Sequence, residues 1–280
     1  MFKIGLGAVV SIVGDDETIW RNRCEIARQE DPDFIEVWIE HWRGNGWLLE
    51  QKAGTLKEMF AGIDVILHAP FLCTSLVAPD LHMRAITMDE MDATIRLGEI
   101  LEADVITVHG GYFYAEHLRR EVRASDILAE NLGQLVKKAR VAGTRIAIEN
   151  LPAEEETLAV CCYPRTTQDL VDVVGAVDGV LATLDIGHAL QNNEAPLRAL
   201  DRVLPILANI HLHDMTSDGI AHRGLGEGVL DVRRCVELLC EKDYTGHLTL
   251  EVSDSSETKA HVVESFRILR ALVERRAMDQ

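Results

Sequence analysis

Short apolar segments rich in Val, Ile and Leu alternate with longer charged segments along the whole chain. The apolar segments are typical of buried parallel strands, which read as nearly continuous apolar runs. The segments 89–103 and 127–143 carry apolar residues at helical spacing, and the second ends at Gly143, a residue type that commonly stops a helix. The predicted strands are residues 3–10, 33–40, 63–70, 104–111, 144–151, 180–188, 208–214 and 247–253.

Eight strand-and-helix units in 280 residues predict a single (β/α)8 TIM barrel, an α/β fold in one domain spanning residues 1–280. A doubly wound sheet is the alternative, and it would carry a glycine-rich phosphate loop between its first strand and first helix. The glycines of GLGAVV lie inside the first predicted strand instead. The first residues also resemble a signal peptide, but the barrel requires a strand there.

Ionisable side chains recur near the C-terminal ends of six predicted strands. They are His68, His109, Glu149, Asp185, His211 and Glu251. Alternate residues of a barrel strand point into the lumen. Two positions before the last four stand Ala147, Thr183, Asn209 and Thr249, whereas the residues of opposite parity are large and aliphatic. We therefore expect the six ionisable groups to converge at the mouth of the barrel where such enzymes carry their sites.

Three of these residues are carboxylates, and burying an unpaired carboxylate is costly. Carboxylates that share one lumen repel each other and take up protons unless a cation neutralises them. Glu149, Asp185, His211 and Glu251 therefore predict a site for one divalent metal ion. Three oxygen ligands and one imidazole suit Mn²⁺, Mg²⁺, Co²⁺ or Zn²⁺ and do not choose among them. A single histidine at a strand end, such as His68, is more often a satisfied core residue.

The overall charge changes which partners are expected. Lys plus Arg number 28 and Asp plus Glu number 46, for a formal net charge of −18. That balance repels nucleic acid and anionic membranes on average, and no apolar run approaches the roughly 18 residues of a membrane span. The 6 cysteines contain no CxxC pair, which favours a cytoplasmic location.

Seven short motifs stand at or just after the predicted strand ends. They are HAP (68–70), VHGG (108–111), IEN (148–150), LDIGH (184–188), HLHD (211–214), HRGLGEG (222–228) and LEV (250–252). In this order the chain resembles the xylose isomerase-like TIM-barrel superfamily, which contains sugar isomerases and epimerases together with endonuclease IV. The resemblance spans nearly the whole chain and implies the same four metal ligands.

The resemblance further implies a metal-dependent isomerase or epimerase acting on a sugar or sugar derivative through an enediolate-type proton transfer. In that branch Glu149 and Glu251 also move protons. The implied substrate-binding residues are His68, His109, His188, His222 and Arg223. The implied partner is a small-molecule sugar, and relatives are often dimers or tetramers, so a homo-oligomer is an expectation. The identity and phosphorylation of the sugar stay open.

Two alternatives remain on the same scaffold. One is a metal-dependent lyase, dehydratase or hydrolase, which uses closely related chemistry. The other is an endonuclease IV-like, zinc-dependent cleavage at abasic sites, with additional zinc ions held by residues such as His68, His109, His188 and His222. That branch has an aspartate two residues before the last of these histidines, and this chain has Ile220 there. A ligand-binding protein without turnover is a further alternative.

Three expectations concern the surroundings of the site. Asp214 faces away from the lumen by parity and is expected to cap the following loop, with His213 near the rim as a supporting or substrate-contacting group. Glu36 has inward parity and is a candidate for binding a substrate hydroxyl. Segments 40–47, 71–82 and 153–166 follow predicted strands and are expected to form the pocket walls.

Overall fold

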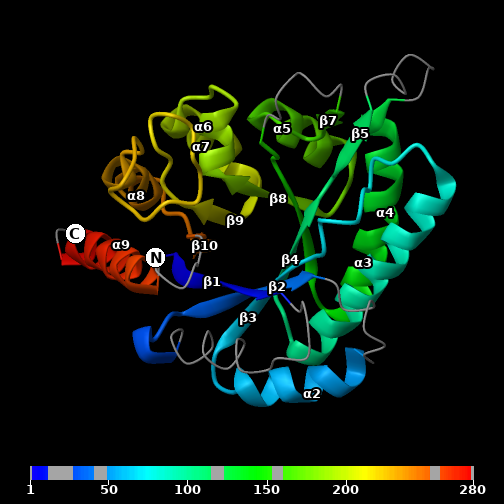
Figure 1. Cartoon of the computed structure of the whole chain (residues 1–280), viewed down its shortest axis with the longest axis horizontal. Coiled ribbons are helices and arrows are strands. Elements are labelled where there is room, and N and C mark those ends of the chain that lie inside the picture. The colour runs from blue at the N-terminus through cyan, green and yellow to red at the C-terminus, as the bar shows by residue number, and fades with distance from the viewer. Residues whose placement is uncertain are drawn as a thin grey trace.

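A closed barrel of parallel strands forms the centre of the molecule (Figure 1). The computed structural model describes residues 2–11, 28–40, 49–114, 123–152, 160–252 and 259–278. The strands follow one another around the barrel in the order β1-β10-β9-β8-β6-β4-β3-β2, which confirms the (β/α)8 prediction. Their bounds are β1 Lys3–Ser11, β2 Phe34–Glu40, β3 Asp64–His68, β4 Val105–His109, β6 Arg145–Glu149, β8 Val180–Asp185, β9 Leu207–Leu212 and β10 His247–Leu250.

The helices lie around the outside of the strands (Figure 1). They are α2 Leu49–Met59, α3 Leu81–Leu101, α4 Ala124–Ala142, α5 Thr167–Ala176, α6 Ile186–Gln191, α7 Pro196–Val203, α8 Val232–Glu241 and α9 Lys259–Met278, with the 3-10 turn η3 Leu204–Ile206. Gly143 ends α4 in the left-handed conformation at φ 77°, as predicted. No helix within the described parts of the chain is long and apolar enough to cross a membrane.

A small antiparallel pair stands outside the barrel and was not predicted. Strand β5 (Tyr112–Tyr114) pairs with β7 (Val160–Cys162). The pair joins the segment after β4 to the segment after β6, so it ties together two neighbouring loops at the end of the barrel where His109 and Glu149 lie. Three-residue strands are too short to show a period in the sequence.

The parity argument is confirmed by the side-chain layers of the barrel. The aliphatic residues of outward parity, such as Ile146, Leu184 and Ile210, join the large core between strands and helices. Inside the lumen a separate cluster of Phe34, Ile66, Val105, Ala147 and Ala208 fills the end near the strand starts. Ala208 is an exception to the parity argument, and it lies at a register shift between β8 and β9.

Polar residues occupy the lumen above this apolar plug. The hydroxyls of Thr107 and Thr183 lie 2.9 Å apart, and the Thr249 hydroxyl donates to Asn209 Oδ1 at 3.1 Å. Each is fully buried. Buried polar groups of this kind are paired with each other, and they form a layer on which the ionisable residues at the mouth rest.

Gly5 of β1 is required by the apolar plug, because a Cβ there would overlap the ring of Phe34. We expect Gly5→Ala to lower the free energy of unfolding by about 1–3 kcal/mol, as overpacking of a filled core does. Gly133→Ala is the control, because its Cβ would meet nothing within 4 Å in α4 and helical alanine is favoured by up to about 1 kcal/mol. Urea unfolding measures both, and equal stability of the two variants would contradict this packing.

Candidate active site

Four side chains from neighbouring strands meet at the mouth of the barrel. Glu149 ends β6, Asp185 ends β8, His211 lies in β9 and Glu251 directly follows β10. The strand register pairs Asp185 with His211 and His211 with Thr249. All four side chains are buried, and one ligand atom from each lies within 4.8 Å of the others. The structure therefore brings together the four residues predicted as metal ligands.

The contacts of His211 show why this group suits a cation. Its Nδ1 lies 3.2 Å from Glu149 Oε1 and 2.9 Å from Glu251 Oε2. That Oε2 atom is buried and has no hydrogen-bond partner among the described residues. A buried carboxylate oxygen that contacts His211 but makes no hydrogen bond is only partly satisfied, and a divalent ion among three carboxylates and one imidazole would satisfy it. The residues present thus fit a divalent metal.

The ionisation of the site follows from its burial and its charges. Burial alone would raise the pKa of Glu149, but His211 and His109 outweigh it and hold the pKa well below its usual value. Burial would lower the pKa of His211, yet Glu36, Glu251 and Glu149 raise it well above its usual value. The imidazoles beside Glu149 therefore favour its charged form against the effect of burial.

His68 and His109 approach the other oxygen of Glu149. Their Nε2 atoms lie 3.2 and 3.1 Å from Glu149 Oε2. His68 donates from Nδ1 to the Ala69 carbonyl at 2.8 Å, which fixes its ring. The carboxylate of Glu149 is thus shared between His211 on one side and these two histidines on the other. His68, His109 and Glu149 are also close enough to hold an ion of their own.

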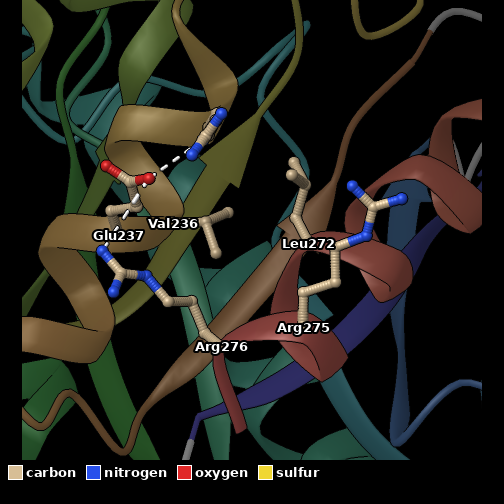
Figure 2. A pocket seen from close by; sticks show the side chains of 6 residues that line it. Val236, Glu237, Leu272, Arg275 and Arg276 are labelled. Carbon is tan, nitrogen blue, oxygen red and sulfur yellow. Dashed lines mark hydrogen bonds and ion pairs between the residues drawn. The ribbon is translucent and has the colours of Figure 1, made fainter. Parts of the chain in front are cut away.

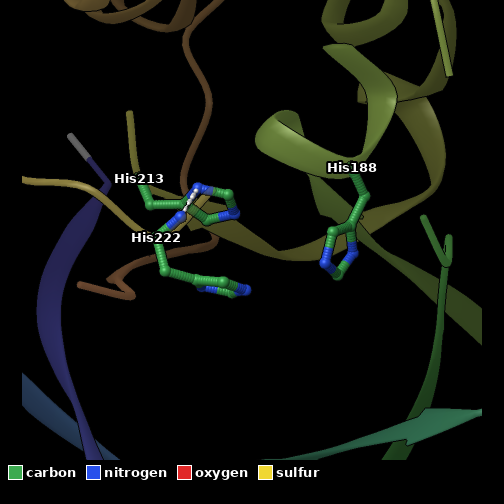
Figure 3. A group of neighbouring side chains, drawn as sticks. All are labelled: His188, His213 and His222. Carbon is green, nitrogen blue, oxygen red and sulfur yellow. Dashed lines mark hydrogen bonds between the residues drawn. The ribbon is translucent and has the colours of Figure 1, made fainter. Parts of the chain in front are cut away.

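Figure 3 shows the remaining histidines of the mouth, His188, His213 and His222. His188 donates from Nδ1 to the Asn150 carbonyl at 3.0 Å, and its ring lies 3.5 Å from Asp185 Oδ2. The rings of His213 and His222 are stacked with centroids 4.1 Å apart. These three side chains lie within 4.8 Å of one another through their nitrogens.

His213 is fully buried and contacts Asp185, one of the four predicted metal ligands. Its Nδ1 lies 2.9 Å from the His222 backbone N–H and 3.2 Å from the Asp214 carbonyl, while its Nε2 lies 3.1 Å from Asp185 Oδ1. Gly187 of the LDIGH motif makes room for this ring, because a Cβ there would overlap it. The expected supporting role of His213 is therefore the one that its contacts show.

Asn150 is a structural residue of the site that sequence reasoning missed. Its side chain donates to the Asp185 carbonyl at 2.9 Å and accepts from the Asp185 N–H at 2.8 Å. This pair of bonds fixes the end of β8 to the end of β6. The signal was present in the IEN motif, where an asparagine follows directly after the glutamate.

Asp214 organises the glycine-rich loop, as its parity predicted. The fully buried carboxylate accepts from four backbone N–H groups at 2.8 to 3.0 Å, which belong to Met215, Gly226, Gly228 and Leu230. These four loop N–H groups donate to Asp214 and are therefore not available to bind a substrate anion. Arg223, in the same loop, is 47% exposed and lies 4.0 Å from Glu227, so its guanidinium is available to a ligand.

Aromatic rings form one wall beside the histidines. Phe71 lies 4.8 Å from His109 and 6.2 Å from Trp38 between ring centroids. Phe71 belongs to the predicted wall segment 71–82. Residues 41–47 of the predicted wall 40–47 and residues 153–159, half of the predicted wall 153–166, lie outside the described residues.

Glu36 lies elsewhere than the sequence suggested. It is fully buried, and its carboxylate oxygens contact His211 Nε2 and accept from Asn209, so they are engaged inside the protein and not open to a substrate hydroxyl.

A depression also lies on the outer surface between α8 and α9, away from the barrel mouth (Figure 2). It is lined by Arg233, Val236, Glu237, Leu272, Arg275 and Arg276. Glu237 accepts from Arg233 at 2.9 Å and lies 3.8 Å from Arg276. Its carboxylate therefore neutralises much of the positive charge there, and the depression carries none of the chemistry of the barrel mouth.

We expect Asp214→Ala to open the loop over residues 222–230, because four N–H groups lose their charged acceptor. Amide hydrogen exchange at Gly226, Gly228 and Leu230 should accelerate at least about tenfold, and the free energy of unfolding should fall by about 3 kcal/mol. Asp218→Ala is the control, since Asp218 is exposed in the same segment. Unchanged exchange in Asp214→Ala would contradict this account.

Comparison with known proteins places this geometry in a family. The uncharacterised protein MJ1311 of Methanocaldococcus jannaschii is 26% identical over 222 residues, 75% of this chain and 73% of that protein. L-ribulose-5-phosphate 3-epimerase UlaE of Escherichia coli is 23% identical over 269 residues, 89% of this chain and 87% of the enzyme. The crystal structure of a D-tagatose 3-epimerase-like protein superposes with a TM-score of 0.80 at 23% identity, covering 98% and 97% of the two chains. The family described as xylose isomerase-like TIM barrel matches residues 24–272, and the chain belongs to it.

Proposed function

We propose that the chain is a metal-dependent isomerase or epimerase of a sugar or sugar derivative. The observation that carries the proposal is that two glutamates, Glu149 and Glu251, face the same ligand nitrogen of His211 from two separate strands, β6 and β10. Between β6 and β10 stand β8 and β9 with the remaining ligands. Two relatives with matching length or fold are named as sugar 3-epimerases or as similar to one.

Proton transfer at the carbon next to a carbonyl needs one group to remove a proton and another to deliver one. A divalent ion held by Glu149, Asp185, His211 and Glu251 would polarise the substrate carbonyl and make the neighbouring C–H more acidic. In our proposal one glutamate removes that proton and the other returns a proton on the opposite face or at the adjacent carbon. Because neighbouring histidines hold Glu149 in its charged form, it can accept a proton at neutral pH.

The other histidines and Arg223 are proposed to bind the substrate. Nδ1 of His188 lies 3.5 Å from Asp185 Oδ2, and Nδ1 of His222 donates to the Glu251 carbonyl at 3.2 Å. Their Nε2 atoms remain for substrate hydroxyls. His68 and His109 line the opposite wall beside Phe71, and Arg223 offers the one charge suited to an anionic group among these residues.

The endonuclease IV-like alternative has one observation in its favour. Two histidines, His68 and His109, place a nitrogen beside Glu149 Oε2, so this chain has donors for more than one ion. Against it, Ile220 replaces a ligand of that branch and is 53% exposed with no donor atom. The net charge of −18 also opposes tight binding to a DNA backbone. A lyase, dehydratase or hydrolase would use the same ion and the same two glutamates.

Exchange of substrate C–H for solvent deuterium tests the proposed proton transfer. The chain loaded with Mn²⁺ or Co²⁺ is incubated with a panel of ketoses and their phosphates, and the exchange is followed by NMR. We expect Glu149→Gln and Glu251→Gln each to slow exchange by about 10²–10⁴-fold, and EDTA to abolish it until metal is returned. Glu274→Gln, an exposed residue of α9, is the control. Exchange that persists in Glu149→Gln would remove Glu149 from its proposed role.

Metal stoichiometry and an abasic DNA duplex separate the isomerase from the nuclease. We expect about one tightly bound ion per chain by elemental analysis and no cleavage of the duplex in the presence of Zn²⁺. Three zinc ions per chain together with strand cleavage at the abasic position would instead establish the endonuclease IV-like function.

A further inference from the structure

We propose that Glu36 is a positioning residue that holds His211 in the one tautomer able to offer Nδ1 to the metal. The inference rests on the metal site of the proposed function and assigns a residue from a strand that contributes no ligand. Glu36 lies in the middle of β2. In the barrel order, β1 and β10 separate β2 from the strand β9 that carries His211, so the Glu36 side chain reaches His211 through the lumen.

The two ring nitrogens of His211 have different partners. Nε2 lies 3.1 Å from both Oε1 and Oε2 of Glu36, while Nδ1 faces Glu149 and Glu251. When Nδ1 holds an ion, the single remaining proton of the imidazole must be on Nε2. The Glu36 carboxylate accepts a hydrogen bond from the Nε2–H group of His211. This contact disfavours the tautomer with the proton on Nδ1, and it makes Nδ1 a stronger metal ligand.

Glu36 is itself held in place by the polar layer. Asn209 Nδ2 donates to Glu36 Oε2 at 3.0 Å. The amide of Asn209 cannot flip, because its Oδ1 already accepts from the Ile210 N–H at 2.9 Å and from the Thr249 hydroxyl at 3.1 Å. The network runs from Thr249 through Asn209 and Glu36 to His211, with every member fully buried. Such a network fixes one orientation of the ring before any ion arrives.

The placement argues against a purely space-filling role for Glu36. A fully buried carboxylate is costly, and a Leu or Met would fill the same volume within the lumen. The Glu36 carboxylate instead accepts hydrogen bonds from the imidazole of His211 and the amide of Asn209. Its negative charge adds to the charges of Glu149, Asp185 and Glu251 around the proposed ion position. Charge behind an imidazole ligand increases affinity for a cation.

Cobalt affinity tests the inference without recourse to turnover. The metal-free chain is titrated with Co²⁺, and binding at this centre is the class of visible absorption that disappears in His211→Ala. Glu36→Gln keeps the volume but loses the charge, and it presents an NH2 group to one of two donors, His211 or Asn209. We expect its affinity for Co²⁺ to fall by about 10–100-fold with an altered spectrum.

Thr107→Val is the matched control, since it removes a buried polar group from the same layer without touching His211. Its Co²⁺ affinity should stay within about twofold of the parent. Glu36→Asp keeps the charge and should recover part of the affinity lost in Glu36→Gln, and it provides the test if Glu36→Gln does not fold.

The outcomes separate the two levels of the proposal. Parent-like Co²⁺ affinity in Glu36→Gln, with only the melting temperature of the metal-free chain lowered, would show that Glu36 is merely structural and would overturn the inference. Absence of a His211-dependent Co²⁺ class in the parent chain would instead overturn the metal site itself.

Discussion

Four carboxylates buried in one barrel lumen are the constraint around which the rest of the mouth is arranged. Glu36, Glu149, Asp185 and Glu251 lie within contact of a few imidazoles and are 0 to 7% exposed. Burying that much negative charge is tolerated only where cations or protonated imidazoles compensate it. The six buried or half-buried histidines around them supply part of that compensation. A divalent ion would take over the largest share of it.

The period of two along each strand made most of this arrangement predictable. Because parallel strands of a closed barrel all end at one mouth, residues of inward parity at the strand ends must meet. The sequence shows small or polar residues two positions earlier, at Ala147, Thr183, Asn209 and Thr249, and these are the residues found inside the lumen. The four residues that meet at the mouth followed from local patterns alone, since each strand carries its own parity and no long-range information was needed.

The contacts across the lumen were not predictable from the sequence. Glu36 has the correct parity, but its partner depends on how the strands of a closed barrel are staggered, and this brings it against Nε2 of His211. The role of Gly187 depends on where the His213 ring lies, 26 positions later in the chain. Asn150 is next to a predicted ligand, yet its partner is the backbone of another strand. Periodicity identifies the face of a residue and not its partner.

The His188, His213 and His222 group decides how many ions the mouth can hold. Both ring nitrogens of His213 have partners inside the protein, Nδ1 with the His222 N–H and the Asp214 carbonyl and Nε2 with Asp185. His188 and His222 each donate from Nδ1 to a backbone carbonyl, which leaves one nitrogen on each ring. Ile220 contributes no donor, and two imidazoles alone fall short of the three or four protein ligands of a zinc site. His68 and His109, by contrast, direct both Nε2 atoms at one carboxylate oxygen of Glu149. Among the described residues the other candidate cation ligands converge on Glu149, which belongs both to the group with His68 and His109 and to the group with Asp185, His211 and Glu251.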